Sequence, residues 1–390
     1  MCDATGQGTP QTCALGCSDT GGSHCEELVP SNNLQQFFDK TPNPADLTLA
    51  GGTLDLDAST FTPTGGKATS ITSFKLAAPS GGAPLTVFVA NNLTLGDITI
   101  DSTNNLINGM VSLNGGVGPG VAFLAKGEVQ VQGRVLVASG AVNIPGCTSP
   151  ATPSQIVGNA RYAAGAGGGG HATDGADGGD VPGGATHLAH GSASGTDQLV
   201  PLRGGCPAGL TVAASSNQLA GRGGGAIQLV SLRSIDVSGT IAADGLAAMM
   251  NDGTGGTSFG GGGGGGGILL EAPHVALSVS GKLLARGGGG NSGDFQPVEV
   301  PDSDTPIAGG ITQVNDGTRS NGGAGGTDTV NPRPGASTPA AVSGESAIRV
   351  AGGGGGGVGR IRINTSDASV DKQSSSVLAG RVTTGVVTAK

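Results

Sequence analysis

Four segments of the chain repeat one pattern, and this internal repeat limits the fold more than any other feature. Each segment contains a short apolar strand, a polar corner, a second apolar strand, one glycine and a third strand; the segments span residues 85–100, 122–137, 227–242 and 268–284, with glycines at Gly96, Gly133, Gly239 and Gly281. A truncated fifth copy follows at 358–363. Alternation of apolar and polar residues predicts strands, and the corners are too short for hairpins. We therefore predict an all-β fold, a parallel β-solenoid in which each repeat stacks on the next.

A β-sandwich is the alternative, but it would place hairpin turns between strands at regular spacing. Residues 34–82 also alternate in short bursts, at Leu47/Leu49, Leu54/Leu56 and Phe74/Leu76, which predicts further strands.

The length between repeats varies, and all of the extra residues fall at one corner. Successive repeat glycines are 37, 106 and 42 residues apart, with the insertions always between a third strand and the next first strand. The insertions, at about 140–225, 245–267 and 287–357, should therefore lie on one side of the solenoid. They contain the glycine tracts 167–170, 223–225, 260–267, 287–290 and 352–357.

Composition narrows what these tracts can be. Glycine supplies 78 of 390 residues and charged residues only 12%, which argues against a helical protein. The glycines cluster instead of recurring every third residue, so collagen is excluded. Flexible linkers are one interpretation. The other is ordered polyglycine II, in which extended tracts lie side by side and exchange backbone hydrogen bonds; tracts that repeatedly adjoin a strand favour it.

The cysteines indicate an oxidising compartment. Residues 1–33 form a small Cys-rich module and residues 34–390 the solenoid; the six cysteines are Cys2, Cys13, Cys17, Cys25, Cys147 and Cys206. Their even number and polar surroundings favour disulfides over a zinc knuckle that would include His24. The four N-terminal cysteines allow three pairings. We predict Cys2–Cys13 with Cys17–Cys25, and Cys147–Cys206.

Charge and hydropathy bear on partners and location. The net charge of −9 disfavours nucleic acid, and no apolar run is long enough for a transmembrane segment. Met1, Cys2 and Asp3 open the sequence without a signal peptide. We expect an extracellular or cell-surface protein whose secretion leader is absent from this chain.

Two segments carry a resemblance to a known family. The stretches IQLVSLRSIDVSGTIAADG and ILLEAPHVALSVSGKLLARGG resemble the right-handed parallel β-helix of the pectin-lyase-like superfamily, in the form found in Gly-rich secreted surface proteins of Gram-negative bacteria. The resemblance covers about residues 45–385. It implies a right-handed solenoid, but this fold hosts lyases, hydrolases, adhesins and passive fibres.

The in-strand carboxylates do not predict an enzyme. Glycoside hydrolysis needs two carboxyl groups facing each other across the substrate, whereas Asp97, Glu128, Asp236 and Glu271 differ in register and are expected to be solvated corner residues. Arg360 and Arg362 alternate with isoleucines, which indicates the outer face of a final strand.

One loop carries potential metal ligands. Residues 171–190 contain His171, Asp174, Asp177, Asp180, His187 and His190. These side chains could bind a divalent cation if they converged, and the Asp/Gly spacing is similar to calcium-binding turns. The alternative is that Asp and Gly serve only as turn residues. No other cofactor is expected.

These observations favour an extracellular structural protein, a subunit of a fibre or matrix. A solenoid with exposed strand edges at its ends can polymerise head to tail. The alternatives are a monomeric adhesin or carbohydrate-binding module that contacts surface glycans, which the scarcity of aromatic residues disfavours, and a polysaccharide lyase or glycoside hydrolase.

Overall fold

A computed structural model of the 390-residue chain describes most of the sequence. The described residues are 13, 15–18, 24–78, 84–101, 106–107, 110–111, 120–137, 147, 162–183, 186–209, 221–247, 260–291, 305, 307–308, 320–339 and 349–390. Cys2 lies outside them.

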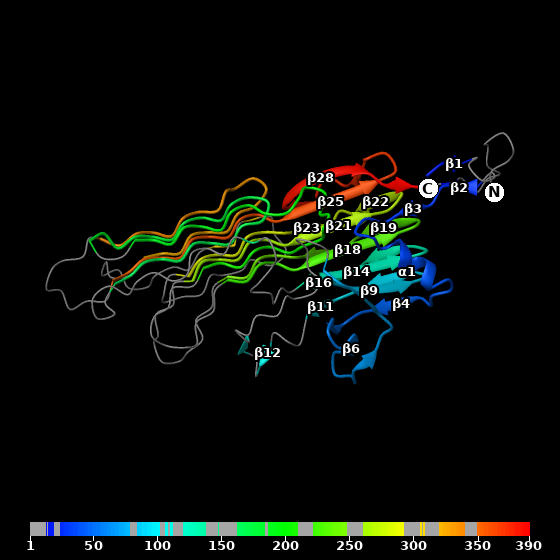
Figure 1. Ribbon diagram of the computed structural model, residues 1–390, viewed down its shortest axis with the longest axis horizontal. Helices are drawn as coiled ribbons and strands as arrows, with labels where there is room; N and C mark the ends of the chain where they lie inside the picture. Colours follow the sequence, from blue (N-terminus) through cyan, green and yellow to red (C-terminus); the bar gives the residue numbers. More distant parts are fainter. Residues whose placement is uncertain are drawn as a thin grey trace.

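Three sheets, each mostly parallel, make up the body of the molecule (Figure 1). The first contains β4 (Leu47–Leu49), β10 (Leu93–Leu95), β15 (Val129–Val131), β19 (Ser234–Val237), β22 (His274–Leu277) and β26 (Asp371–Lys372). The second contains β5 (Gly52–Asp55), β11 (Ile98–Asp101), β16 (Arg134–Val137), β20 (Thr240–Ala242), β23 (Lys282–Leu284) and β27 (Val377–Ala379), with antiparallel β6 (Thr60–Pro63) and β7 (Thr69–Ser70) at one end. The third contains β9 (Leu85–Ala90), β14 (Gly120–Ala125), β18 (Ala226–Ser231), β21 (Gly267–Glu271), β25 (Arg360–Thr365) and β28 (Arg381–Val386), with antiparallel β8 (Phe74–Leu76) at one end.

Each sequence repeat contributes one strand to each sheet. The chain passes from β9 to β10 to β11, and the next repeat places β14, β15 and β16 beside these three in register. The repeat glycines lie at one corner, where Gly239 donates its N–H to Val131 of the repeat below. The predicted parallel all-β pattern is confirmed, and the strands expected before residue 82 are β4, β5 and β8.

The fifth repeat differs from its prediction. It is complete, because β25 is followed by β26 and β27, and β28 then adds a further strand beyond β25. Arg360 is therefore not on the outer face of a final strand: it is buried between β21 and β28, with 7% of its surface exposed.

Apolar side chains from all three sheets form one core. The core alternates along the strands, as in Leu93/Leu95 and Ile235/Val237, and includes the stacked rings of Phe88 and Phe123, 5.3 Å apart. Each fully buried side chain of this size stabilises the fold by about 1.5–3 kcal/mol. A second cluster covers the other face of the sheet that contains β9, where the helix α1 (Gln35–Lys40) places Phe37 and Phe38. The sequence pattern did not predict this helix.

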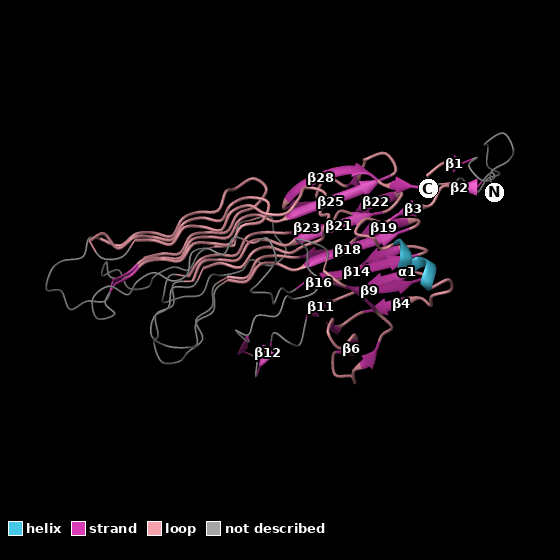
Figure 2. Cartoon of the chain, in the orientation of Figure 1, coloured by secondary structure: helices cyan, strands magenta, loops and turns pink. Residues whose placement is uncertain are grey.

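The described parts of the long insertions leave the body on the same side. Residues 162–183, 186–209, 221–225, 243–247, 260–266, 285–291, 320–339 and 349–359 extend away from the sheets as parallel runs of chain, drawn almost entirely as loops to one side in Figure 2. We call this part the glycine blade. Its tracts lie between β16 and β18, between β20 and β21, and between β23 and β25. Four short pairs lie outside the three sheets. Two of them are β12 (Leu106–Ile107) with β13 (Met110–Val111), and β17 (Tyr162–Ala163) with β24 (Arg349–Val350).

The first described strands and the C-terminus lie close together (Figure 1). Strand β3 (Leu28–Val29) pairs antiparallel with β29 (Thr388–Ala389), and before it β1 (Cys17–Ser18) pairs with β2 (His24–Cys25). Cys13 forms its disulfide with Cys25, so the predicted pairs Cys2–Cys13 and Cys17–Cys25 are wrong. The antiparallel pairing of β1 with β2, which the sequence pattern did not predict, places Cys25 opposite Cys17 and within reach of Cys13. The Cys147–Cys206 disulfide is confirmed.

Candidate functional site: the glycine blade and its base

The glycine blade is held together by backbone hydrogen bonds that repeat every three residues. In tract 352–357, the N–H groups of Gly352 and Gly355 donate to one neighbouring tract, those of Gly353 and Gly356 to a second, and those of Gly354 and Gly357 to a third; the acceptors are Ala336 and Arg333, Asn291 and Gly288, and Ala166 and Gly169. The carbonyl groups accept from three further tracts, through Gly179 and Ala176, Gly323 and Gly326, and Gly262 and Gly265. A β-strand directs its polar groups to two sides only. This tract directs them in six directions, as an extended helix with about three residues per turn would.

Close approach of the backbones is why this part of the chain is glycine. A Cβ atom on Gly355 would collide with the carbonyl oxygen of Ala324, and one on Gly356 with that of Gly263. Tract 352–357 is buried along its whole length. Every polar group of such a tract must find a partner, and the neighbouring tracts provide it.

Five of the six predicted metal ligands form a ladder on the exposed side of the blade. Asp177 accepts hydrogen bonds from the backbone N–H of His190 (2.9 Å) and from its Nδ1 (2.8 Å), and Asp180 does the same for His187 (2.7 and 2.9 Å). Asp174 accepts from the N–H of Ala193 at 2.6 Å. We call these residues the Asp–His ladder. The Nε2 of His187 lies 3.8 Å from Asp177 Oδ2, and the Nε2 of His190 lies 3.8 Å from Asp174 Oδ2. Each imidazole therefore lies between two carboxylates.

The ladder favours ionised carboxylates. Burial opposes ionisation of Asp177, but hydrogen bonds from His190 outweigh it and lower the pKa of this carboxyl below its ordinary value. The same balance, with His187, lowers the pKa of Asp180. Within the described part of the chain, no three His, Cys, Asp or Glu side chains are grouped to hold a metal ion. The calcium site remains a prediction from the sequence.

His171 is the sixth predicted ligand, and it lies elsewhere. It is fully buried in the blade, where its Nδ1 is 2.8 Å from the carbonyl oxygen of Gly265 and its Nε2 has no hydrogen-bond partner among the described residues. Burial, together with the positive charges of Arg360 and Arg203, lowers the pKa of His171 to about 3. The imidazole is therefore neutral at physiological pH and donates from Nδ1.

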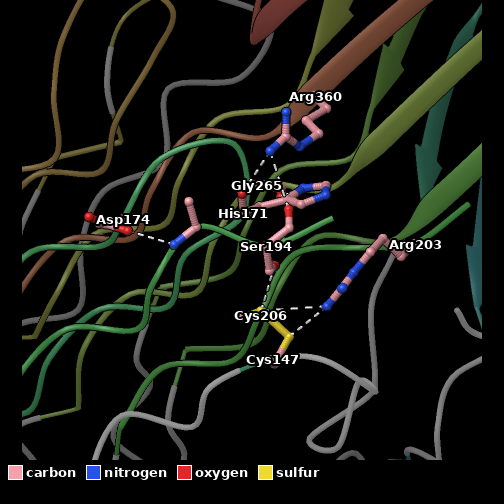
Figure 3. Close-up of a disulfide and its surroundings, with 9 residues drawn as sticks. Cys147, His171, Asp174, Ser194, Arg203, Cys206, Gly265 and Arg360 are labelled. Atoms are coloured by element: carbon pink, nitrogen blue, oxygen red, sulfur yellow. Dashed lines mark hydrogen bonds between the residues drawn. A yellow bond between two sulfur atoms is a disulfide. The ribbon is translucent and has the colours of Figure 1, made fainter. Parts of the chain in front are cut away.

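Two buried arginines lie at the base of the blade, beside His171 (Figure 3). Arg360 forms an ion pair with Asp197 and donates to the carbonyl oxygens of Ser194 (3.3 Å) and His171 (3.4 Å). Burial lowers the pKa of Arg360, although Asp197 opposes this effect. Sequence reasoning missed this cluster because its members are far apart in the chain and belong to different tracts.

Arg203 contacts the blade disulfide. Its Nη2 is 3.3 Å from Cys147 Sγ and 4.0 Å from Cys206 Sγ, and the side chain is 4% exposed (Figure 3). Burial, and then the charge of Arg360, lowers the pKa of Arg203. On the other side, Ser194 Oγ lies 3.2 Å from Cys206 Sγ.

The in-strand carboxylates are only partly as predicted. Asp97, Glu128 and Asp236 are exposed, but Glu271 is buried, so its interpretation as a solvated corner residue is wrong. Its carboxyl group is hydrogen-bonded to the side-chain amides of Gln228 and Asn364, which lie on neighbouring strands, and to Ser31 of the N-terminal segment.

Asp236 does have an acidic neighbour in register, which the sequence did not reveal. Asp236, Ala276 and Asp371 are aligned on β19, β22 and β26, so two strand spacings, about 10 Å, separate the two acidic residues. They line a shallow groove of about 350 Å³ with Val279. Asp371 was overlooked because the last repeat was expected to end before it.

Comparisons with protein-family models, with curated proteins and with solved structures found no match to this chain. No helix among the described residues is long and apolar enough to span a membrane.

Proposed function

We propose that the chain is a structural protein of the cell surface or extracellular matrix, built as a right-handed parallel β-solenoid with a polyglycine II blade. The observation that carries this proposal is the hydrogen-bonding of tract 352–357 to six neighbouring tracts. Such an array takes up the polar groups of the backbone and leaves few side chains for binding or catalysis. It supports a mechanical role, in which the blade is a stiff projection from the body.

The disulfides support an extracellular location. One disulfide links Cys147 to Cys206 of the blade, and the other links Cys13 to Cys25 within the N-terminal segment. Disulfides persist in oxidising compartments.

The C-terminal end of the three sheets supports assembly. Strands β26, β27 and β28 are the last members of their sheets, and among the described residues no strand pairs with their outer sides. The N–H groups of Arg381, the first residue of β28, and of Val387, the residue directly after it, point toward β25 and donate to Gly359 and Thr365. Successive N–H groups along a strand point to opposite sides. Thr384 is three residues from both Arg381 and Val387, so its N–H points outward. In the proposed fibre, these outward groups pair with the opposite end of the next subunit.

A second candidate is a monomeric surface module, and protection of both ends favours it. The antiparallel strands β6, β7 and β8 cover the N-terminal end of two sheets. At the other end, the guanidinium of Arg362 donates to the outward carbonyl of Thr384 at 2.7 Å. Charged side chains at a strand edge are a known protection against pairing.

Electron microscopy of the secreted protein, without reductant and over a range of concentrations, tests the proposal. We expect filaments, and we expect Thr384→Pro to abolish them, because proline removes the outward N–H without removing a bond to β25. Thr384→Ala keeps the N–H and is the matched control. Single particles at every concentration would overturn assembly through the ends and favour the monomeric module. Degradation of a polysaccharide by the wild type, lost in Asp371→Asn, would overturn the structural role itself.

A further inference from the structure

We propose that the Cys147–Cys206 disulfide is a site of thiol–disulfide exchange, whose substrate is a thiol: a small dithiol or a cysteine of a partner protein. The first observation is the charge beside it. Arg203 is buried, and among the described residues no carboxylate pairs with it; its nearest polar contact is the sulfur of Cys147. A disulfide sulfur is a weak, uncharged acceptor. The oxidised protein therefore holds a buried cation without an anion, which is costly.

Reduction supplies the missing anion. A thiolate at Cys147 or Cys206 would face a guanidinium whose Nη2 lies 3.3 Å and 4.0 Å from the two sulfur positions. A nearby arginine lowers the pKa of a thiol. Because this attraction exists only in the reduced state, it stabilises that state and makes the disulfide a stronger oxidant.

Exposure decides which sulfur is attacked. Cys206 is fully buried, whereas Cys147 is half-buried and can be reached from solvent. The incoming thiolate attacks Cys147 Sγ and forms a new S–S bond there, while the Cys147–Cys206 bond breaks and Cys206 leaves as a thiolate. That thiolate accepts a hydrogen bond from Ser194 Oγ, 3.2 Å away, and faces Arg203. A leaving thiol with a lower pKa leaves faster.

The outcome depends on the thiol. With a dithiol, its second thiolate attacks its own sulfur in the mixed disulfide and releases Cys147 as a thiolate; the dithiol is oxidised to a cyclic disulfide and the cystine gains two electrons. With a single protein thiol, the mixed disulfide is the product, and a partner becomes covalently joined to Cys147.

The chain contains its own comparison. Cys13–Cys25 lies in an N-terminal segment, residues 1–33, that has no Lys or Arg and carries Glu26 and Glu27 directly after Cys25. Neighbouring carboxylates disfavour a thiolate. We therefore expect this disulfide to resist exchange.

The test is the rate at which dithiothreitol reduces each disulfide in the intact chain, followed by alkylation and peptide mass spectrometry. Although Cys206 is buried, Cys147–Cys206 should react at least tenfold faster than Cys13–Cys25, because a lowered pKa of the leaving thiol speeds exchange by about this factor. This comparison needs no variant. Equal rates, or slower reduction of Cys147–Cys206, would overturn the proposal.

Variants separate the charge effect from simple destabilisation. Arg203→Met should slow reduction of Cys147–Cys206 by about tenfold, and Ser194→Ala several-fold, with Cys13–Cys25 unchanged. A merely structural arginine would give the opposite sign, since loosening the blade exposes the disulfide and speeds its reduction. Arg222→Met, which removes another buried arginine of the blade, is the matched control for loosening. Unchanged or faster reduction in Arg203→Met would contradict the proposed role.

Discussion

At the scale of single residues, Glu271 shows how this fold accommodates a buried charge. Its carboxylate is 2% exposed and accepts four hydrogen bonds: from the N–H and Oγ of Ser31 (3.0 and 2.7 Å), from Gln228 (2.6 Å) and from Asn364 (3.1 Å). Gln228 and Asn364 come from the strands on either side of β21, and Ser31 comes from the N-terminal segment. One carboxylate therefore fastens that segment to the sheet.

Glu271→Gln should destabilise the protein although it preserves the shape of the side chain. All four contacts are donors, so an amide nitrogen would face a donor and leave it without an acceptor. We expect a loss of about 3 kcal/mol in the free energy of unfolding, measured by urea titration. Glu128→Gln, on an exposed carboxylate, should change it by less than about 0.5 kcal/mol. Equal effects of the two substitutions would show that the buried network does not hold the N-terminal segment.

At the scale of elements, the glycine tracts depend on the absence of side chains more strictly than a β-strand does. Tract 352–357 is surrounded by other tracts, to which it bonds in six directions. A strand can place a side chain above or below its sheet, whereas an enclosed tract has no such free side.

Gly355→Ala tests this requirement. The new Cβ would meet the backbone carbonyl of Ala324, which cannot rotate away, so we expect a loss of about 3 kcal/mol in the free energy of unfolding. At Gly66 the Cβ would meet only the Pro63 side chain, at 3.1 Å. Gly66→Ala should therefore change stability by less than about 1 kcal/mol. A tolerated alanine at position 355 would contradict a close-packed blade and favour flexible linkers.

Elements with a sequence period could be predicted, and contacts between distant segments could not. Strands β18 to β23 follow from alternation of apolar residues around Gly239 and Gly281. The spacing of three that separates Asp174, Asp177 and Asp180, and likewise His187 from His190, was visible and could have revealed the Asp–His ladder. The hydrogen bonds that surround Glu271 could not be predicted from the sequence, because Ser31 is 240 residues away. Nor could the contact of the Arg203 guanidinium with the sulfur of Cys147, which is 56 residues away.

At the scale of the whole molecule, the junction between body and blade gathers buried basic groups. His171 and Arg203 come from the blade, and Arg360 begins β25 of the body. Asp197 forms ion pairs with Arg360 and, at 3.9 Å, with Arg381. A protonated His171 would add a positive charge here that has no carboxylate to pair with among the described residues. Protonation of His171 is therefore expected to destabilise the packing of the blade against the body.

The protein should lose stability on mild acidification because of this junction. The pKa of His171 is about 3 in the folded chain, against an ordinary value of about 6.5 in the unfolded chain. Between these values the unfolded chain binds a proton that the folded chain does not. The contribution of His171 to the free energy of unfolding is therefore complete above about pH 6.5, and below that it falls by about 1.4 kcal/mol for each unit by which the pH is lowered.

The lowered pKa values of Asp177 and Asp180 affect stability in a lower pH window, because those carboxylates protonate below their ordinary pKa of 3.8. Urea titrations from pH 7 to 4.5 stay above that lower window, and comparison of the wild type with a His171 variant isolates the contribution of His171. His171→Asn keeps a donor for Gly265 and removes the titration, so its free energy of unfolding should fall less steeply with pH than that of the wild type. Parallel slopes for the two proteins would mean that His171 is not buried as a neutral base at this junction.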